Sequence, residues 1–182
     1  MGNNVYMKKA FTMIELLVVM AIMGILTIIT VSQFTTAKIK ARDAQRKADL
    51  SSVSKALLMY YADYSKFPNA NAGRIQLNVN EKNDVFDWGG EFSDGTGDPL
   101  GLYMKVLPEE DNQSAYPYCY WTDADGSSYA ILGHLENDQD VDGYRKDNPN
   151  PVIRNISCNG VGGYNYGFTS PNTSLDEIDT AM

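Results

Sequence analysis

The fold of this chain is decided by residues 8–19, Lys8-Lys9-Ala10-Phe11-Thr12-Met13-Ile14-Glu15-Leu16-Leu17-Val18-Val19. The apolar run that begins here extends over 21 residues, 11–31, and Glu15 is its only charged residue. A helix of about 20 apolar residues is long enough to cross the hydrocarbon core of a bilayer. A carboxylate inside such a helix costs roughly 2.5–3.5 kcal/mol near the bilayer centre. A simple anchor would not carry that cost, so the pattern indicates that Glu15 is a functional residue whose partner lies elsewhere.

The two lysines, the small residue and the apolar run together resemble the processing site of class III signal peptides, which occur in type IV pilins and in the pseudopilins of type II secretion systems. The resemblance implies that a prepilin peptidase cuts between Ala10 and Phe11 and methylates the new amino terminus. The apolar segment then stays on the mature protein as membrane anchor and polymerisation helix. Ala10 departs from the family pattern, because glycine usually stands at this position.

The resemblance also implies a role for Glu15, which would pair with the methylated amine of Phe11 on a neighbouring subunit during filament assembly. A buried carboxylate and a buried ammonium each lose hydration free energy unless they meet, so this pairing would set the axial register between subunits. The alternative is that Glu15 lies at the headgroup boundary near the helix start, where the helix dipole favours an anion.

The charges are distributed unevenly. Residues 11–67 hold seven Lys/Arg and four Asp/Glu, whereas residues 68–182 hold six Lys/Arg and nineteen Asp/Glu. An acidic head argues against nucleic acid as its main partner. Counting cations alone would place the amino terminus outside the cell, because more cations follow the apolar run than precede it. The leader resemblance and the acidic, cysteine-containing head favour export of the carboxyl side instead. A conventional cleaved signal peptide is a weaker alternative, since the apolar run is too long and no clear cleavage site follows it.

A second helical pattern follows the apolar run. Small residues recur at helical spacing: Ala37, Ala41, Ala44 and Ala48. Larger apolar residues continue on a similar spacing: Leu50, Val53, Leu57, Tyr60 and Tyr64. Charged residues lie between these stripes, and Asp43 stands four residues before Lys47, a spacing at which the two side chains pair. The pattern predicts one helix over about 11–64, apolar all round in its first half and packed on a domain along its second half.

The expected fold class is α+β, with the pilin-like lollipop shape of a long N-terminal helix that carries a small antiparallel β-sheet head. Residues 1–10 are the leader, 11–31 the transmembrane and polymerisation half of the helix, 32–66 its amphipathic half, and 67–182 the globular head. The helix is expected to end before Pro68, because proline disfavours helical geometry in the residue that precedes it.

The head is expected to contain few strands. Residues 69–100 are rich in Asn, Asp and Gly and predict a connecting loop with one short strand. Residues 101–108 fit either a short helix or an edge strand. The aromatic and β-branched runs 116–122 and 129–135 flank a turn and predict a β-hairpin. The polar, turn-rich tail from Glu136 predicts a long carboxyl-terminal loop region.

Two cysteines, Cys119 and Cys158, lie in the head. Two cysteines in an exported domain most often form a disulfide. In type IV pilins a disulfide commonly joins the carboxyl-terminal loop to the sheet, and the resemblance implies the same here. The alternative is a pair of free thiols.

Carboxylates alternate along the start of the tail, at Asp138, Asp140 and Asp142, and Gly143 follows them. This is the opening half of a calcium loop, because the alternation lets hard oxygen ligands converge. Asp147 is a further candidate ligand, although Pro149 stands where an EF-hand needs a glutamate. The resemblance agrees, since major pseudopilins hold calcium in a carboxyl-terminal loop. The alternative is a solvated acidic turn.

No catalytic site is expected. His134 is the only histidine, and the sequence holds no nucleophile–base pair, phosphate loop or hydrolase metal spacing. Apart from calcium in the acidic loop, no cofactor is expected.

The expected function is structural: a subunit of a type IV pilus or a type II secretion pseudopilus, which forms a homo-oligomeric helical filament. The implied partners are a prepilin peptidase, an inner-membrane assembly platform and, before assembly, the membrane. The implied location is the inner membrane, with a single span and the head outside the cytoplasm, and then an extracellular or periplasmic filament. Two alternatives stay open: a minor pilin or adhesin-type binding module, and a solitary membrane-anchored calcium-binding protein.

Overall fold

The computed structural model describes residues 11–79, 82–95, 101–110, 116–143, 153, 158 and 160–180. These residues belong to two compact units, one that ends at Lys40 and one that begins at Ala41. The expected leader, residues 1–10, lies outside the described residues.

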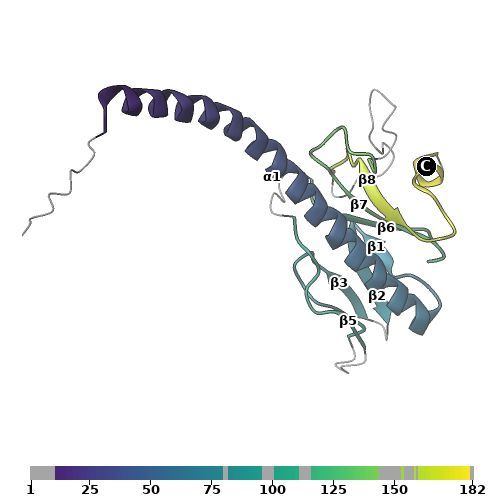
Figure 1. Cartoon of the computed structure of the whole chain (residues 1–182). Coiled ribbons are helices and arrows are strands. Elements are labelled where there is room, and N and C mark those ends of the chain that lie inside the picture. Colours follow the sequence, from purple (N-terminus) through teal and green to yellow (C-terminus); the bar gives the residue numbers. More distant parts are fainter. Residues whose placement is uncertain are drawn as a thin grey trace, which may run out of the picture. The chain divides into compact units, whose positions relative to one another are not determined.

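Helix α1, Met13–Tyr64, is the longest element of the chain (Figure 1). It confirms the predicted helix and starts two residues later than expected. At its end Ser65 adopts a positive φ of 56° and donates its backbone N–H to the carbonyl of Tyr61 over 2.8 Å. A residue in this left-handed conformation stops a helix, and Pro68 prevents its continuation.

The region predicted as a connecting loop forms a sheet instead. Its three antiparallel strands, in spatial order, are β1 (Asn69–Asn71), β2 (Arg74–Val79) and β3 (Lys82–Phe86). The one short strand that was expected here is β2, in which Ile75 and Leu77 are buried and Gln76 between them is not. Strands β1 and β3 on its two sides were not predicted. The turn between β1 and β2 depends on Gly73, whose φ is +84°.

Two further sheets complete the second unit. One pairs β4 (Phe92–Ser93) with β5 (Leu102–Met104), so residues 101–108 supply an edge strand. The other has the order β6 (Cys119–Thr122), β7 (Tyr129–Gly133) and β8 (Tyr166–Thr169), and all its neighbours are antiparallel. The β6–β7 pair is the hairpin expected from residues 116–135. The described part of the tail contains more secondary structure than predicted, namely β8 and helix α2 (Leu175–Thr180).

The main core lies between the second half of α1 and the sheets. The predicted stripe of larger residues is confirmed, since Leu50, Val53, Leu57 and Tyr60 are at most 2% exposed. They pack with aromatic and aliphatic side chains from every sheet, among them Ile75, Phe92, Tyr103, Tyr120 and Ile131. Strand β7 comes very close to the helix, because a Cβ at Gly133 would lie 3.1 Å from Leu50 Cδ1.

The alanine stripe does not face this core. Ala41, Ala44 and Ala48 are exposed, whereas Asp43 and Arg46 are buried on the face that continues into Leu50. Helical spacing alone did not decide between the two faces, because both repeat every three to four residues. The polar face is buried because its charges pair with groups in the segments that follow β5 and β7.

A disulfide joins Cys119 in β6 to Cys158 in the tail, with 5.8 Å between the Cα atoms. Around it lies a second, smaller core: Ala130, Leu132, Ile153, Tyr164 and Ile178. The disulfide thus fixes the carboxyl-terminal segment to the third sheet and helps to cover the side of that sheet that α2 contacts.

Candidate functional site

The first turn of α1 holds Glu15 in a capping box. The Thr12 hydroxyl and backbone N–H both donate to Glu15 Oε2, at 2.7 and 2.8 Å, and the N–H of Glu15 donates to Thr12 Oγ1 at 3.3 Å. This pair satisfies amide groups that have no partner within the helix. Among the described residues no cation pairs with the Glu15 carboxylate. Phe11 is exposed and is the first described residue, and Ala10 lies outside the described part of the chain.

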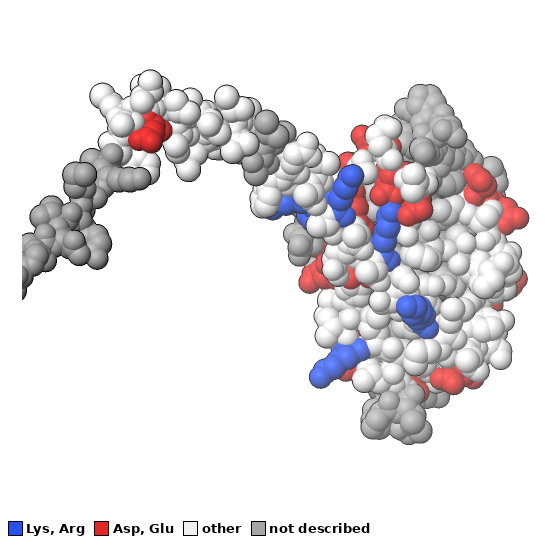
Figure 2. Space-filling model, viewed as in Figure 1, with Lys and Arg blue, Asp and Glu red and all other residues white. Residues whose placement is uncertain are grey.

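The described surface of α1 up to Phe34 is largely apolar, and Glu15 is its only charge. All large hydrophobic side chains described there are at least 44% exposed, and Figure 2 shows almost no charge along this part of the helix. By length and composition, α1 is the one helix of the described residues that could cross a membrane. Its apolar surface needs a cover that the described residues do not provide, either lipid or other helices.

The second unit buries a cluster of ions against α1. Arg46 donates to both oxygens of Glu110 at 2.9–3.1 Å, to Asp43 Oδ1 at 2.8 Å and to Glu136 Oε1 at 2.7 Å. Arg42 adds a second, more exposed pair with Glu136. The Arg46 side chain is only 9% exposed, so its guanidinium is held by carboxylates from three parts of the sequence.

Asp43 also holds the segment after β7. Its two carboxylate oxygens accept the backbone N–H groups of Glu136 and Asn137, each at 2.9 Å. The pairing expected between Asp43 and Lys47 is therefore wrong: Asp43 bonds to Arg46 and to this backbone, and Lys47 reaches other carboxylates. Hydrogen bonds from Arg42, and also from Arg46, outweigh burial and lower the pKa of Glu136 to about 2.

Lys47 binds the acidic loop. Its Nζ donates to Asp140 Oδ1 at 2.5 Å and to Asp142 Oδ2 at 2.7 Å. The amine also lies 5.6 Å from the centre of the Tyr166 ring. Of the other expected ligands, Asp138 is exposed and has no ion pair with any described residue, and Asp147 lies outside the described residues.

Among the described residues, this arrangement holds an ammonium where a calcium ion was expected. Calcium takes 6–8 oxygen ligands at about 2.3–2.6 Å, and here the point on which two carboxylates converge is occupied by an ammonium. Within the described residues, no group of three or more His, Cys, Asp or Glu side chains is placed to hold a metal.

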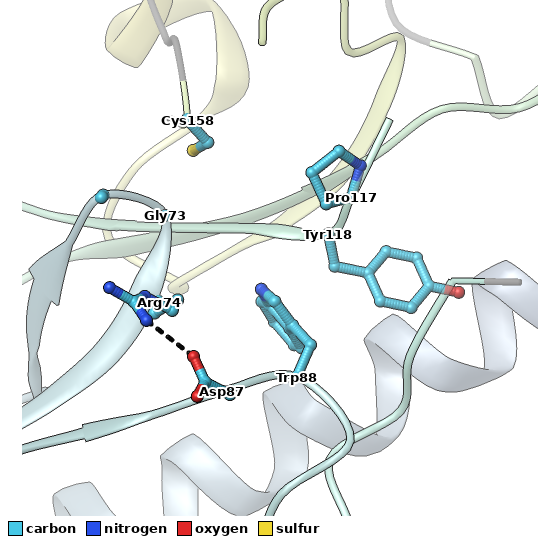
Figure 3. Close-up of a pocket in the computed structure, with 8 residues that line it drawn as sticks. Gly73, Arg74, Asp87, Trp88, Pro117, Tyr118 and Cys158 are labelled. Atoms are coloured by element: carbon cyan, nitrogen blue, oxygen red, sulfur yellow. Dashed lines mark hydrogen bonds and ion pairs between the residues drawn. The ribbon is translucent and has the colours of Figure 1, made fainter. Parts of the chain in front are cut away.

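A shallow pocket opens beside the β1–β2 turn (Figure 3). In Figure 3 the Trp88 indole projects between the Arg74–Asp87 ion pair and the Tyr118 ring, which it meets edge to face at 5.6 Å. The Trp88 Nε1 atom is buried and has no hydrogen-bond partner among the described residues. The pocket is open, and its rim is a solvent-exposed ion pair.

The described residues contain no catalytic arrangement around His134. Its ring stacks on Tyr116 with 4.0 Å between centres, and its Nδ1 lies 3.0 Å from the carbonyl oxygen of Gly163. No carboxylate, hydroxyl or thiol partner that would make it a base is bonded to it there.

The sequence analysis did not predict two of these features, the capping box and the ion cluster. The capping box could have been predicted, because Thr12 and Glu15 have the spacing of that motif directly before an apolar run. The ion cluster was not visible, because Arg46 meets Glu110 and Glu136 across 64 and 90 residues.

Comparison with known proteins agrees with these features. The family model described as "Prokaryotic N-terminal methylation motif" matches residues 6–31. The type II secretion system core protein G of Pectobacterium carotovorum subsp. carotovorum is 32% identical over 72 residues, which cover 40% of this chain and 46% of that protein. The protein of the same name from Pseudomonas aeruginosa is 29% identical over 150 residues, which cover 74% of this chain and 93% of that protein. No solved structure matches significantly.

The methylation motif lies on the apolar start of α1, and the longer of the two matches runs through both the helix and the sheets of the head. A long amino-terminal helix followed by small antiparallel sheets is the architecture expected from the resemblance. The methylation motif, the similarity to two type II secretion core proteins and this architecture together support the family of type IV pilins and pseudopilins.

Proposed function

We propose that this chain is a filament-forming subunit of a type II secretion pseudopilus, anchored in the inner membrane before assembly. The observation that carries the proposal is the exposed apolar surface of α1, interrupted by the single carboxylate of Glu15. The relatives named above are core proteins of type II secretion systems, which favours a pseudopilus over a surface pilus.

The helix has two states in this proposal. Residues 11–31 span the membrane in the stored subunit, and the same surface packs against neighbouring helices in the filament. Both environments cover apolar side chains, so transfer between them loses little hydrophobic free energy. The head, residues 67–182, stays outside the cytoplasm throughout.

Maturation precedes assembly. A prepilin peptidase removes residues 1–10 by cutting after Ala10 and methylates the amine of Phe11. The amine then meets the Glu15 carboxylate of an adjacent subunit, because neither charge is stable in an apolar filament core without the other. An assembly platform in the inner membrane lifts the subunits into the growing filament.

Intact mass of subunits from sheared filaments tests the maturation step. The expected mass lacks residues 1–10, is about 14 Da heavier for one methyl group and is about 2 Da lighter for the disulfide. Recovery of only full-length protein, confined to the membrane fraction, contradicts the proposal.

Two substitutions separate the role of Glu15 in assembly from its role in the capping box. Glu15→Gln keeps the cap, because glutamine also occupies the third position of capping boxes, but removes the charge. Thr12→Ala removes the cap and keeps the charge. We expect Glu15→Gln to reduce filament yield at least about tenfold, the loss for an interaction of 1.4 kcal/mol, and Thr12→Ala to leave most of it. Equal losses in both variants would show that Glu15 acts through the helix start alone.

A further inference from the structure

We propose that the Lys47 amine is the built-in cation of the acidic loop, so that residues 138–143 are held against α1 without calcium, and that removal of this amine opens the same loop to Ca²⁺. The spacing of the three aspartates predicts a cation site, and the structure supplies the cation from within the chain.

The loop is shaped around one point of positive charge. Asp140 Oδ1 and Asp142 Oδ2 lie 2.5 and 2.7 Å from Lys47 Nζ. The N–H of Asp142 donates to the same Asp140 oxygen at 3.0 Å, which keeps the two carboxylates on one side of the turn. The N–H of Gly143 donates to the carbonyl of Asp140 at 3.2 Å and closes the turn.

The Lys47 amine is held by two carboxylates and an aromatic ring. The Asp140 side chain is 17% exposed and the Lys47 side chain 23%, so their contact is largely shielded from water. The centre of the Tyr166 ring lies 5.6 Å from the amine, and a cation near a ring face is further stabilised. Burial raises the pKa of Asp140, but the hydrogen bonds from Lys47 and from the Asp142 backbone N–H, together with the positive charge of Lys47, lower it below its ordinary value, so this carboxylate stays charged over the physiological range.

A calcium ion and this ammonium exclude each other. Two cations cannot share a point that lies about 2.5 Å from the same oxygens, because their repulsion is strong at that distance. Calcium would have to displace Lys47, and its binding would then cost the two ion pairs that already neutralise the loop. With the amine absent, three alternating carboxylates and a glycine turn remain, and their net charge attracts a divalent cation.

The test compares the full-length protein in detergent micelles as wild type, Lys47→Met, Lys47→Arg and Lys55→Met. Methionine keeps the apolar stem that packs beside Tyr166 and removes the charge, and arginine keeps the charge. Lys55 provides the matched control, because it is an exposed lysine two turns further along the same helix. Each protein is freed of metal with EDTA, and its thermal midpoint is measured with EDTA, with CaCl₂ and with MgCl₂ at equal ionic strength. Calcium binding is measured separately by titration calorimetry.

The wild type, Lys47→Arg and Lys55→Met should show no calcium-specific shift and no binding heat. Lys47→Met should bind Ca²⁺ with a Kd of roughly 10⁻⁴–10⁻³ M, the range of extracellular calcium modules. In about 10 mM CaCl₂ its midpoint should rise by roughly 3–10 °C above its value in EDTA. Calcium binding to the wild-type loop would overturn the proposal, and so would a Lys47→Met protein that folds but ignores calcium. Neither result depends on filament assembly, so the proposed function is tested separately.

Discussion

Replacement of Arg46 by methionine is the most informative perturbation of the head. The arginine donates five hydrogen bonds to Asp43, Glu110 and Glu136. Without it, the carboxylates of Asp43 and Glu110 stay buried, at 2% and 8% exposure, and lose their guanidinium. Removal of one partner from a buried ion pair costs about 3–5 kcal/mol. The lower end applies here, because Glu136 reaches solvent and keeps Arg42, so we expect a loss of roughly 3 kcal/mol and a thermal midpoint lower by about 10 °C.

The assay is thermal unfolding of the full-length protein in detergent micelles, followed by near-ultraviolet circular dichroism. This signal reports the packed tyrosines of the head and is little affected by the apolar start of α1. Arg42→Met is the matched control, since the Arg42 side chain is 45% exposed and pairs only with Glu136 in the described residues, and it should cost less than about 1 kcal/mol. Glu110→Gln added to Arg46→Met should recover part of the loss, because it removes an unpaired buried charge.

Equal midpoints for Arg46→Met and Arg42→Met would refute this reasoning. They would mean that burial of the ion cluster does not increase its contribution to the free energy of unfolding. Failure of Glu110→Gln to recover any stability would show that the loss comes from packing of the arginine stem and not from the uncompensated carboxylate.

Three further predictions concern the head. The pKa of Glu136 is lowered from its ordinary 4.5 to about 2, so its stabilising effect should be complete above about pH 4.5 and disappear as the pH falls toward 2. Glu136→Gln should therefore flatten that part of a stability–pH profile measured by urea unfolding. Reduction of the Cys119–Cys158 disulfide, which spans 39 positions, should lower the free energy of unfolding by roughly 3–4 kcal/mol, and the reductant should have no effect on a double Cys→Ala variant. Gly73→Ala should lower the free energy of unfolding in urea by about 2 kcal/mol or more, because φ is +84° there and the new Cβ would lie 2.5 Å from Cys158 Cβ. A decrease of less than about 0.5 kcal/mol would contradict the turn geometry.

Local signals predicted the helix well. Its end at Tyr64 follows from Pro68 a few residues later, and its buried stripe from Leu50 onward follows from spacing alone. Such features depend on neighbours along the chain, which a sequence displays directly.

Features that join distant segments could not be predicted in the same way. The alternation around Ile75 and Leu77 predicts the one strand β2, whereas its neighbours β1 and β3 consist largely of Asn, Asp, Ala and Lys and have no local pattern that separates them from a loop. The buried face of α1 at Asp43 and Arg46 was hidden for another reason. A charged residue on a helix normally indicates a solvent-exposed position. Asp43 and Arg46 are buried only because folding brings charged partners from distant segments to them.

The charges of α1 fall into two kinds, and the difference bears on function. Arg46 and Lys47 find carboxylates within their own chain, so their loss should lower the stability of a single subunit. Glu15 has only Thr12 as a partner among the described residues, and glutamine can replace it there. Glu15→Gln should therefore leave the thermal midpoint of the subunit within about 1 °C, a change of a few tenths of a kcal/mol, while filament yield falls. If Glu15→Gln lowered the midpoint as much as Arg46→Met, Glu15 would be a structural residue of the subunit, and its cation would not have to come from a neighbour.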